Sequence, residues 1–147
     1  MACPFFMPTK RFDEGAWQHP ARLPLGAGWE GHCTAPGHEG ARPTQEDLHE
    51  CCNLGYASKC SRIPADRSWD AVRFAVARED KSQVVLNFVC ERSHRPVEHG
   101  QLRFEIFSQD CLAPHPDLRI QKMAACFLQS HLARSRWQLP AAATTDL

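Results

Sequence analysis

The stretch HCTAPGHEGARPTQEDLHECCNLGYASKC, residues 32–60, is the part of the sequence that decides the fold. Its 29 residues hold four cysteines and three histidines among glycines and prolines, without a periodic apolar pattern. A segment with so little apolar material cannot fold around itself, whereas a bound metal can supply the missing folding energy. We therefore expect this stretch to form a metal or cluster site, with Cys3 as a further ligand.

The composition of the whole chain sets wider bounds on its function. A chain of 147 residues with 43% apolar residues can bury a core of its own, as one domain or as one domain with a small appended module. The 17 basic and 17 acidic residues give a net charge of zero. Because nucleic-acid binding depends largely on neutralising phosphates, a nucleic-acid partner is not expected.

The cysteine content bears on the cellular compartment. No run of about 18 apolar residues predicts a membrane span, and the apolar start of the chain is interrupted by Pro4 and Pro8, unlike a secretory signal. We expect a cytoplasmic protein. In that reducing compartment eight cysteines indicate metal or redox chemistry, and a secreted disulfide-bonded protein is the less favoured alternative.

The chain divides by composition into two parts and a tail. Residues 1–67 contain seven of the eight glycines and are predicted to be a loop-dominated, Cys-rich module that binds a metal or cluster. Residues 68–138 are predicted to form an antiparallel sheet with a C-terminal helix, packed with the first part as one compact unit. Residues 139–147 are predicted to be a flexible tail.

One short helix is expected inside the Cys-rich module. Thr44 is a favourable N-cap, and Asp47 three residues later completes an imperfect capping box. On this helix Leu48 shares a face with Cys51 and Cys52, at i+3 and i+4. The helix would therefore present a thiol beside an apolar anchor.

The second part has the periodicity of a sheet and a covering helix. Apolar residues alternate over 72–76, 84–90 and 102–106, with polar turns at 79–82 and around 93–96 and Gly100, which predicts a three-stranded antiparallel meander. A helix over 117–137 follows, and its apolar stripe is predicted to pack on the sheet. The expected fold class is α+β. The stripe comprises Ile120, Met123, Ala124, Phe127, Leu128, His131 and Leu132.

Four cysteines in separate segments are the predicted ligands. They are Cys3, Cys33, Cys52 and Cys60, with Cys51, His38 and His49 as alternates. Cys52 is preferred to Cys51 because it lies where the helix unwinds and free backbone amides can donate to its sulfur. Cys90 and Cys126 fall on the periodic elements and are expected to be buried as small apolar residues; the role of Cys111 is open.

The spacing favours a four-iron cluster (4Fe-4S) over zinc. Structural zinc most often takes its ligands from C-x2-4-C pairs, and the chain has none, although a mixed Cys and His site is not excluded. A cluster needs thiolates arriving from different directions and backbone N–H donors around its sulfurs, which single cysteines on separate loops suit. The spacing matches neither common ferredoxin pattern, so no family is indicated.

Three functions follow from these ligands. Electron transfer or redox sensing by an iron-sulfur cluster is favoured, a non-catalytic adaptor with structural zinc is the alternative, and a thiol-dependent enzyme, with His32 or His49 beside a cysteine, is the third. An enzymatic function is the less favoured interpretation of the sequence. A protein redox partner could dock on the basic last helix, whose positive residues are Arg119, Lys122, Arg134 and Arg136.

Overall fold

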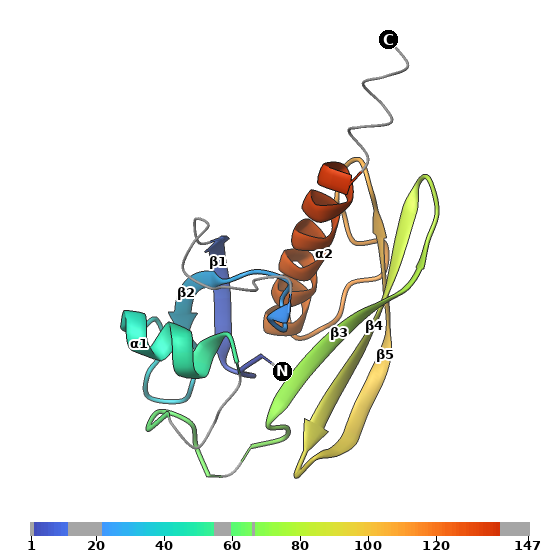
Figure 1. Cartoon of the computed structure of the whole chain (residues 1–147). Helices are drawn as coiled ribbons and strands as arrows, with labels where there is room; N and C mark the ends of the chain where they lie inside the picture. The colour runs from blue at the N-terminus through green and yellow to red at the C-terminus, as the bar shows by residue number, and fades with distance from the viewer. Residues whose placement is uncertain (1, 12–21, 55–59, 66, 139–147) are drawn as a thin grey trace.

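The chain folds as an α+β protein with one helix between two antiparallel sheets (Figure 1). The computed structural model describes residues 2–11, 22–54, 60–65 and 67–138. The two-stranded sheet and the short helical segment α1 lie on one side of the long helix α2, and the three-stranded sheet lies on the other (Figure 1). Within the described residues, no helix is long and apolar enough to cross a membrane.

The three-stranded sheet confirms the predicted meander. β3 (Ala71–Glu79), β4 (Gln83–Arg92) and β5 (Arg95–Glu105) pair antiparallel in sequence order. The apolar positions of β4 face the core as predicted, since the side chains at 84, 86, 88 and 90 are all buried. Ser93 and His94 close the β4–β5 hairpin with φ angles of 51° and 63°, as a tight two-residue turn requires.

β5 begins earlier than the sequence predicted. Pro96 and Gly100 were expected in the turn, but both lie within the strand. β5 is an edge strand, where a proline is tolerated because the missing N–H need not be paired. Gly100 lies opposite Phe88, and a Cβ at Gly100 would stand 3.0 Å from the Phe88 ring. The glycine therefore makes room for an aromatic ring and does not mark a turn.

α2 (Leu118–Gln138) agrees with the predicted helix to within one residue at each end. The Asp117 carboxylate accepts a hydrogen bond from the Arg119 N–H at 2.9 Å, which satisfies one of the free donors of the first turn. Phe127 is only partly buried, beside Phe74, and His131 contacts Glu79 at the margin of the helix. The fully buried stripe consists of Ile120, Met123, Ala124, Cys126, Leu128, Ser130 and Leu132.

The two strands of the Cys-rich part were not predicted. β1 (Phe6–Arg11) pairs antiparallel with β2 (Trp29–Cys33), with an irregularity between Pro8 and Lys10. A proline in β1 and a glycine in β2 make both strands look like loops, and the pairing is long-range, so local periodicity gives no signal. Gly31 permits the close approach, since a Cβ there would meet the carbonyl oxygen of Met7 and lie 2.8 Å from the Cα of Pro8.

The two sheets share one hydrophobic core. Ala2 forms a two-way backbone bridge with Val72 of β3, with N···O distances of 3.0 and 3.3 Å. Phe6 and Trp29 belong to the same buried cluster as residues of β3, β4, β5 and α2. The change in composition near residue 67 is therefore not a boundary between separate cores. The proposed tail at 139–147 lies outside the described residues.

We predict that Gly31→Ala destabilises the β1–β2 pair by about 2 kcal/mol or more, because the added methyl group overlaps backbone that cannot move independently. Urea unfolding and hydrogen exchange of the β1 and β2 amides measure the effect. Gly37→Asn is the control, since Gly37 has open space around it and a φ of 81° that asparagine tolerates. Equal stability of Gly31→Ala and the wild type would contradict the close packing.

Candidate metal centre

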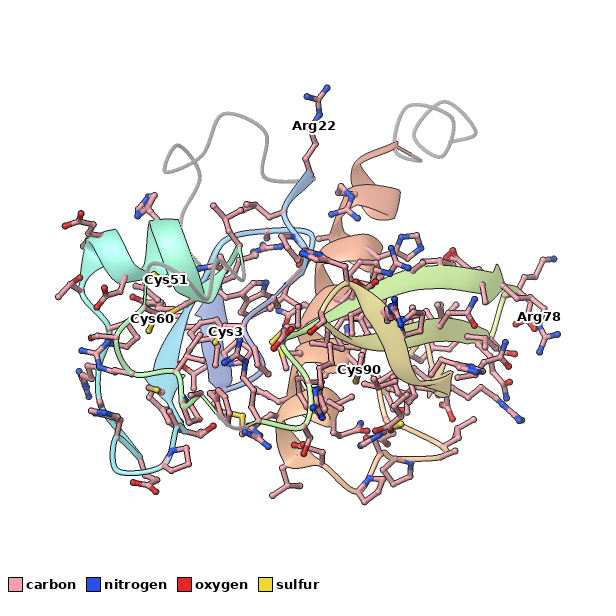
Figure 2. The ribbon with its side chains drawn as sticks, turned by 90° about the horizontal axis from the view of Figure 1, so that it is seen from below. Cys3, Arg22, Cys51, Cys60, Arg78 and Cys90 are labelled. Atoms are coloured by element: carbon pink, nitrogen blue, oxygen red, sulfur yellow. The ribbon has the colours of Figure 1, made fainter. Side chains whose placement is uncertain are left out.

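The segments that carry the four predicted cysteine ligands lie in one region of the structure. Cys3 lies just before β1, Cys33 ends β2, Cys52 ends the π-helical turn η2 (Leu48–Cys52), and Cys60 opens the segment after it. The Cys3 N–H donates to the Cys52 carbonyl at 3.2 Å, and Phe6 pairs with Cys33 across the two strands. Burial raises the pKa of Cys3 and of Cys52 most; Cys60 raises both further, Cys33 adds to the rise at Cys3, and Cys3 adds to that at Cys52. Figure 2 shows Cys3 and Cys60 in the same half of the molecule, away from Cys90 in the sheet.

Cys52 is positioned by a capped helical segment. Thr44 and Asp47 form the predicted capping box at the start of α1 (Gln45–Asp47), with both hydrogen bonds at 3.1 Å. The segment then widens into η2, where the Asn53 N–H donates to the Leu48 carbonyl at 3.4 Å, five residues back. Leu48, Cys51 and Cys52 are all buried. The widened turn was not predicted; such turns are rare and occur frequently at functional sites.

Asn53 fastens the end of η2 to β2. Its side-chain oxygen accepts from the Trp29 N–H at 3.0 Å, and its side-chain nitrogen donates to the carbonyls of Trp29 at 2.9 Å and Leu48 at 3.0 Å. Asn53 is 1% exposed, so these three bonds replace contacts with water that it cannot make. Cys52 is thereby held at a fixed position relative to the strand that carries Cys33.

Backbone N–H groups lie close to two of the cysteines. The Ala35 N–H donates to Cys33 Sγ at 3.3 Å. Burial raises the pKa of Cys3, and the backbone N–H groups of Phe5 and Phe6 offset part of that rise. In each case a donor comes from the residue two positions after the cysteine. Such donors are typical of thiolates that bind a metal or a cluster.

Arg62 connects the Cys60 segment to α1. Its guanidinium lies 3.2 Å from the Asp47 carboxylate, and the Asp47 side chain raises the pKa of Arg62 most, followed by Cys60 and Cys33. The pKa of Asp47 is lowered chiefly by the Thr44 N–H and further by Arg62. A fixed positive charge therefore lies beside two of the thiols, where it offsets part of their negative charge once they ionise.

Burial determines the protonation state of the other two thiols. It raises the pKa of Cys3 to about 11 and that of Cys52 still further. Both are therefore thiols at neutral pH without a metal, because a buried thiolate lacks solvation. A metal must displace these protons on binding.

The alternate ligands are less well placed. His38 is exposed in the loop after β2, and the His49 ring nitrogen Nδ1 lies 2.7 Å from the Gln45 carbonyl oxygen. Cys51 is buried next to Cys52 and raises its pKa, so the structure does not decide between the two. In the described part of the chain, no group of three or more His, Cys, Asp or Glu side chains is arranged to hold a metal ion. The thiols would have to turn toward a common centre to bind one.

One buried donor belongs to the core that also contains Cys3 and Cys52. Trp29 Nε1 is buried and has no hydrogen-bond partner among the described residues. An unpaired buried N–H costs about 1–3 kcal/mol, so an acceptor within its reach would stabilise the fold.

The remaining cysteines lie outside this group, and two arginines of α2 make contacts within the chain. Cys90 and Cys126 are buried in the core as predicted, and burial raises the pKa of each to about 12. Cys111 is half-buried and bridges to Phe104 of β5. Two arginines of the predicted basic helix face turn inward, since Arg119 pairs with Asp117 and Arg134 donates to the Gly26 carbonyl at 2.8 Å.

The comparisons with known proteins give no match. No family model matches the chain, no curated protein matches its sequence, and no solved structure matches its fold. The function must therefore be argued from the residues of this chain.

We predict that Asn53→Ala lowers the free energy of unfolding by about 3 kcal/mol, because it removes the acceptor of the buried Trp29 N–H and the side-chain hydrogen bonds to the carbonyls of Trp29 and Leu48. Chemical denaturation followed by tryptophan fluorescence measures the change. Asn87→Ala is the matched control, since Asn87 is exposed and its side chain accepts one hydrogen bond among the described residues, from Gln101 at 3.1 Å; the substitution should cost less than about 0.5 kcal/mol. Equal effects of the two variants would contradict the role of Asn53.

Proposed function

We propose that this protein binds a four-iron cluster through Cys3, Cys33, Cys52 and Cys60, and that it transfers electrons or senses redox state in the cytoplasm. The observation that supports the proposal is that backbone hydrogen bonds join the segments of Cys3, Cys33 and Cys52, and that Cys60 lies near enough to Cys3 and Cys52 to interact with them electrostatically. A cluster takes its thiolates from several directions, and each of these segments contributes one.

The surroundings of the thiols fit such a cluster. Cys3 and Cys52 are buried among apolar residues, which shields a cluster from water. The Ala35 N–H donates to the sulfur of Cys33, and the backbone N–H groups of Phe5 and Phe6 favour the thiolate of Cys3. When bound, the cluster would supply one-electron transfer; the chain would hold it, exclude water and adjust its potential through these donors and through Arg62.

Zinc is the alternative occupant of the same thiols, and it would make the protein a non-catalytic adaptor. The N–H donors stabilise a zinc-bound thiolate as well, so the identity of the metal is decided by experiment. A thiol-dependent enzyme has less support, because burial raises the pKa of Cys3 and Cys52, and a nucleophilic cysteine needs the opposite shift.

The proposal includes a protein redox partner. The basic surface of α2 that could bind this partner is smaller than the sequence predicted. Arg119 and Arg134 make contacts within the chain, and Lys122 of α2 is exposed. Basic groups beside the thiols, such as Arg62, are the better candidates to steer an acidic partner toward the cluster.

The cluster can be tested by anaerobic purification and reconstitution with iron and sulfide. We expect a brown protein with absorbance near 400 nm that bleaches on reduction, and about four irons per chain. A colourless protein under both aerobic and anaerobic conditions, with one zinc per chain by elemental analysis, would contradict the cluster and favour the zinc alternative.

Single cysteine variants test the ligand set. Alanine in place of Cys3, Cys33, Cys52 or Cys60 should reduce bound iron from about four to below one per chain. Cys90→Ala and Cys126→Ala are matched controls, because both residues are buried outside the site; each should retain the iron and lose only about 1 kcal/mol of stability. Loss of iron on Cys90→Ala would add Cys90 to the ligand set. Retention of iron on Cys52→Ala, together with its loss on Cys51→Ala, would replace Cys52 by Cys51 as a ligand.

Metal removal should act on the two parts of the chain differently. A chelator is expected to raise hydrogen exchange in residues 1–67 far more than in β3, β4 and β5, because metal-binding energy there is folding energy. Mass spectrometry of the exchanged protein, with and without chelator, measures this. A uniform rise along the chain would show that the metal supports the whole fold equally.

A further inference from the structure

A cavity of about 290 Å³ lies beside the loops that carry the thiols. Phe5 follows Cys3 by two residues, Pro64 follows Cys60 by four, and Arg119 comes from the first turn of α2. The cavity is thus formed where the Cys-rich part meets the helix. The residues that matter for its chemistry are Phe5, Pro64, Arg67, Trp69, Asp117 and Arg119.

Two aromatic rings and one guanidinium form part of its wall. The Arg119 guanidinium carbon lies 5.2 Å from the ring centre of Phe5 and 5.8 Å from that of Trp69. Asp117 holds it in place, with Nε and Nη2 of Arg119 at 3.2 and 3.1 Å from the carboxylate oxygens. This fixed, planar cation beside aromatic rings suits stacking with another flat ring.

The second arginine is held as firmly. Arg67 donates from Nε to the Asp70 carboxylate at 2.7 Å and from Nη1 to the Pro64 carbonyl at 2.8 Å. Nη2 of Arg67 and Nη1 of Arg119 therefore remain without a hydrogen-bond acceptor among the described residues. Both side chains are only partly exposed, at 22% and 27%. The cavity wall thus keeps two donors available to an anion.

Each arginine of the wall is paired with a carboxylate, Arg119 with Asp117 and Arg67 with Asp70. The wall therefore attracts an anion through its two free N–H donors and not through an excess of positive charge. Arginine is suited to carboxylates because its planar donors match their geometry. The volume is at the lower limit for small-molecule sites and admits one or two fused rings.

We propose that this cavity binds a small planar aromatic carboxylate. The ring packs against Phe5, Trp69 and the face of Arg119, and the carboxylate accepts from the free amino groups of Arg67 and Arg119. The inference depends only on the cavity wall and holds whichever metal the thiols bind.

Binding of 1-naphthoate and of its neutral counterpart 1-naphthamide to the full chain, as purified, tests the proposal. The indole N–H signal of Trp69, identified in the NMR spectrum with Trp69→Phe, reports on the wall of the cavity. For a ligand of this size we expect a Kd of about 0.5 mM for naphthoate. Naphthamide should bind at least about tenfold more weakly, since it lacks the charge.

Variants locate the site. Arg119→Gln and Arg67→Gln should each weaken naphthoate binding at least about tenfold. Arg78→Gln should leave it unchanged, because Arg78 lies at the far end of the sheet (Figure 2). Equal binding of naphthoate and naphthamide, an unmoved Trp69 signal at saturating naphthoate, or equal weakening by Arg78→Gln would each overturn the proposal. The comparison of the two ligands on the wild-type protein requires no variant to fold.

Discussion

Three hydrogen bonds from one buried side chain hold the Cys-rich half of this protein together. Asn53 joins the end of η2 to β2, and the N–H of Cys3 donates to the carbonyl of Cys52 at 3.2 Å. These bonds tie the segments of Cys3, Cys33 and Cys52 to one another through backbone groups. The segments that carry these cysteines are therefore joined by polar contacts, in a region that has few periodic apolar residues of its own.

This arrangement depends in turn on the sheet and helix behind it. Ala2 adds to the edge of β3, and Phe6 and Trp29 extend into the core that α2 shares with the three-stranded sheet. A region of loops, a short helix and two short strands gains stability by packing on a larger core, since its own apolar area is small. The same contact between the two parts forms the cavity beside Arg119, so the candidate metal centre and the candidate ligand site have a common wall at Phe5.

The sequence predicted the elements that rest on local patterns. The period-two alternation located β3 and β4, the apolar stripe located α2, and Thr44 with Asp47 predicted the capping box. It did not predict β1 and β2, because Pro8 and Gly31 conceal strands whose pairing is long-range. Asn53 and Arg119 were also overlooked or assigned to the surface, since a polar side chain shows its internal partners only in three dimensions. The four cysteines were chosen by residue type and by their place in separate segments, and as metal ligands they remain a prediction.

The most direct test of the central claim is X-ray absorption at the iron and zinc edges of protein purified without oxygen. The proposed cluster predicts iron with sulfur neighbours and a second shell of iron. Zinc alone, with sulfur at about 2.3 Å and no metal neighbour, would contradict it.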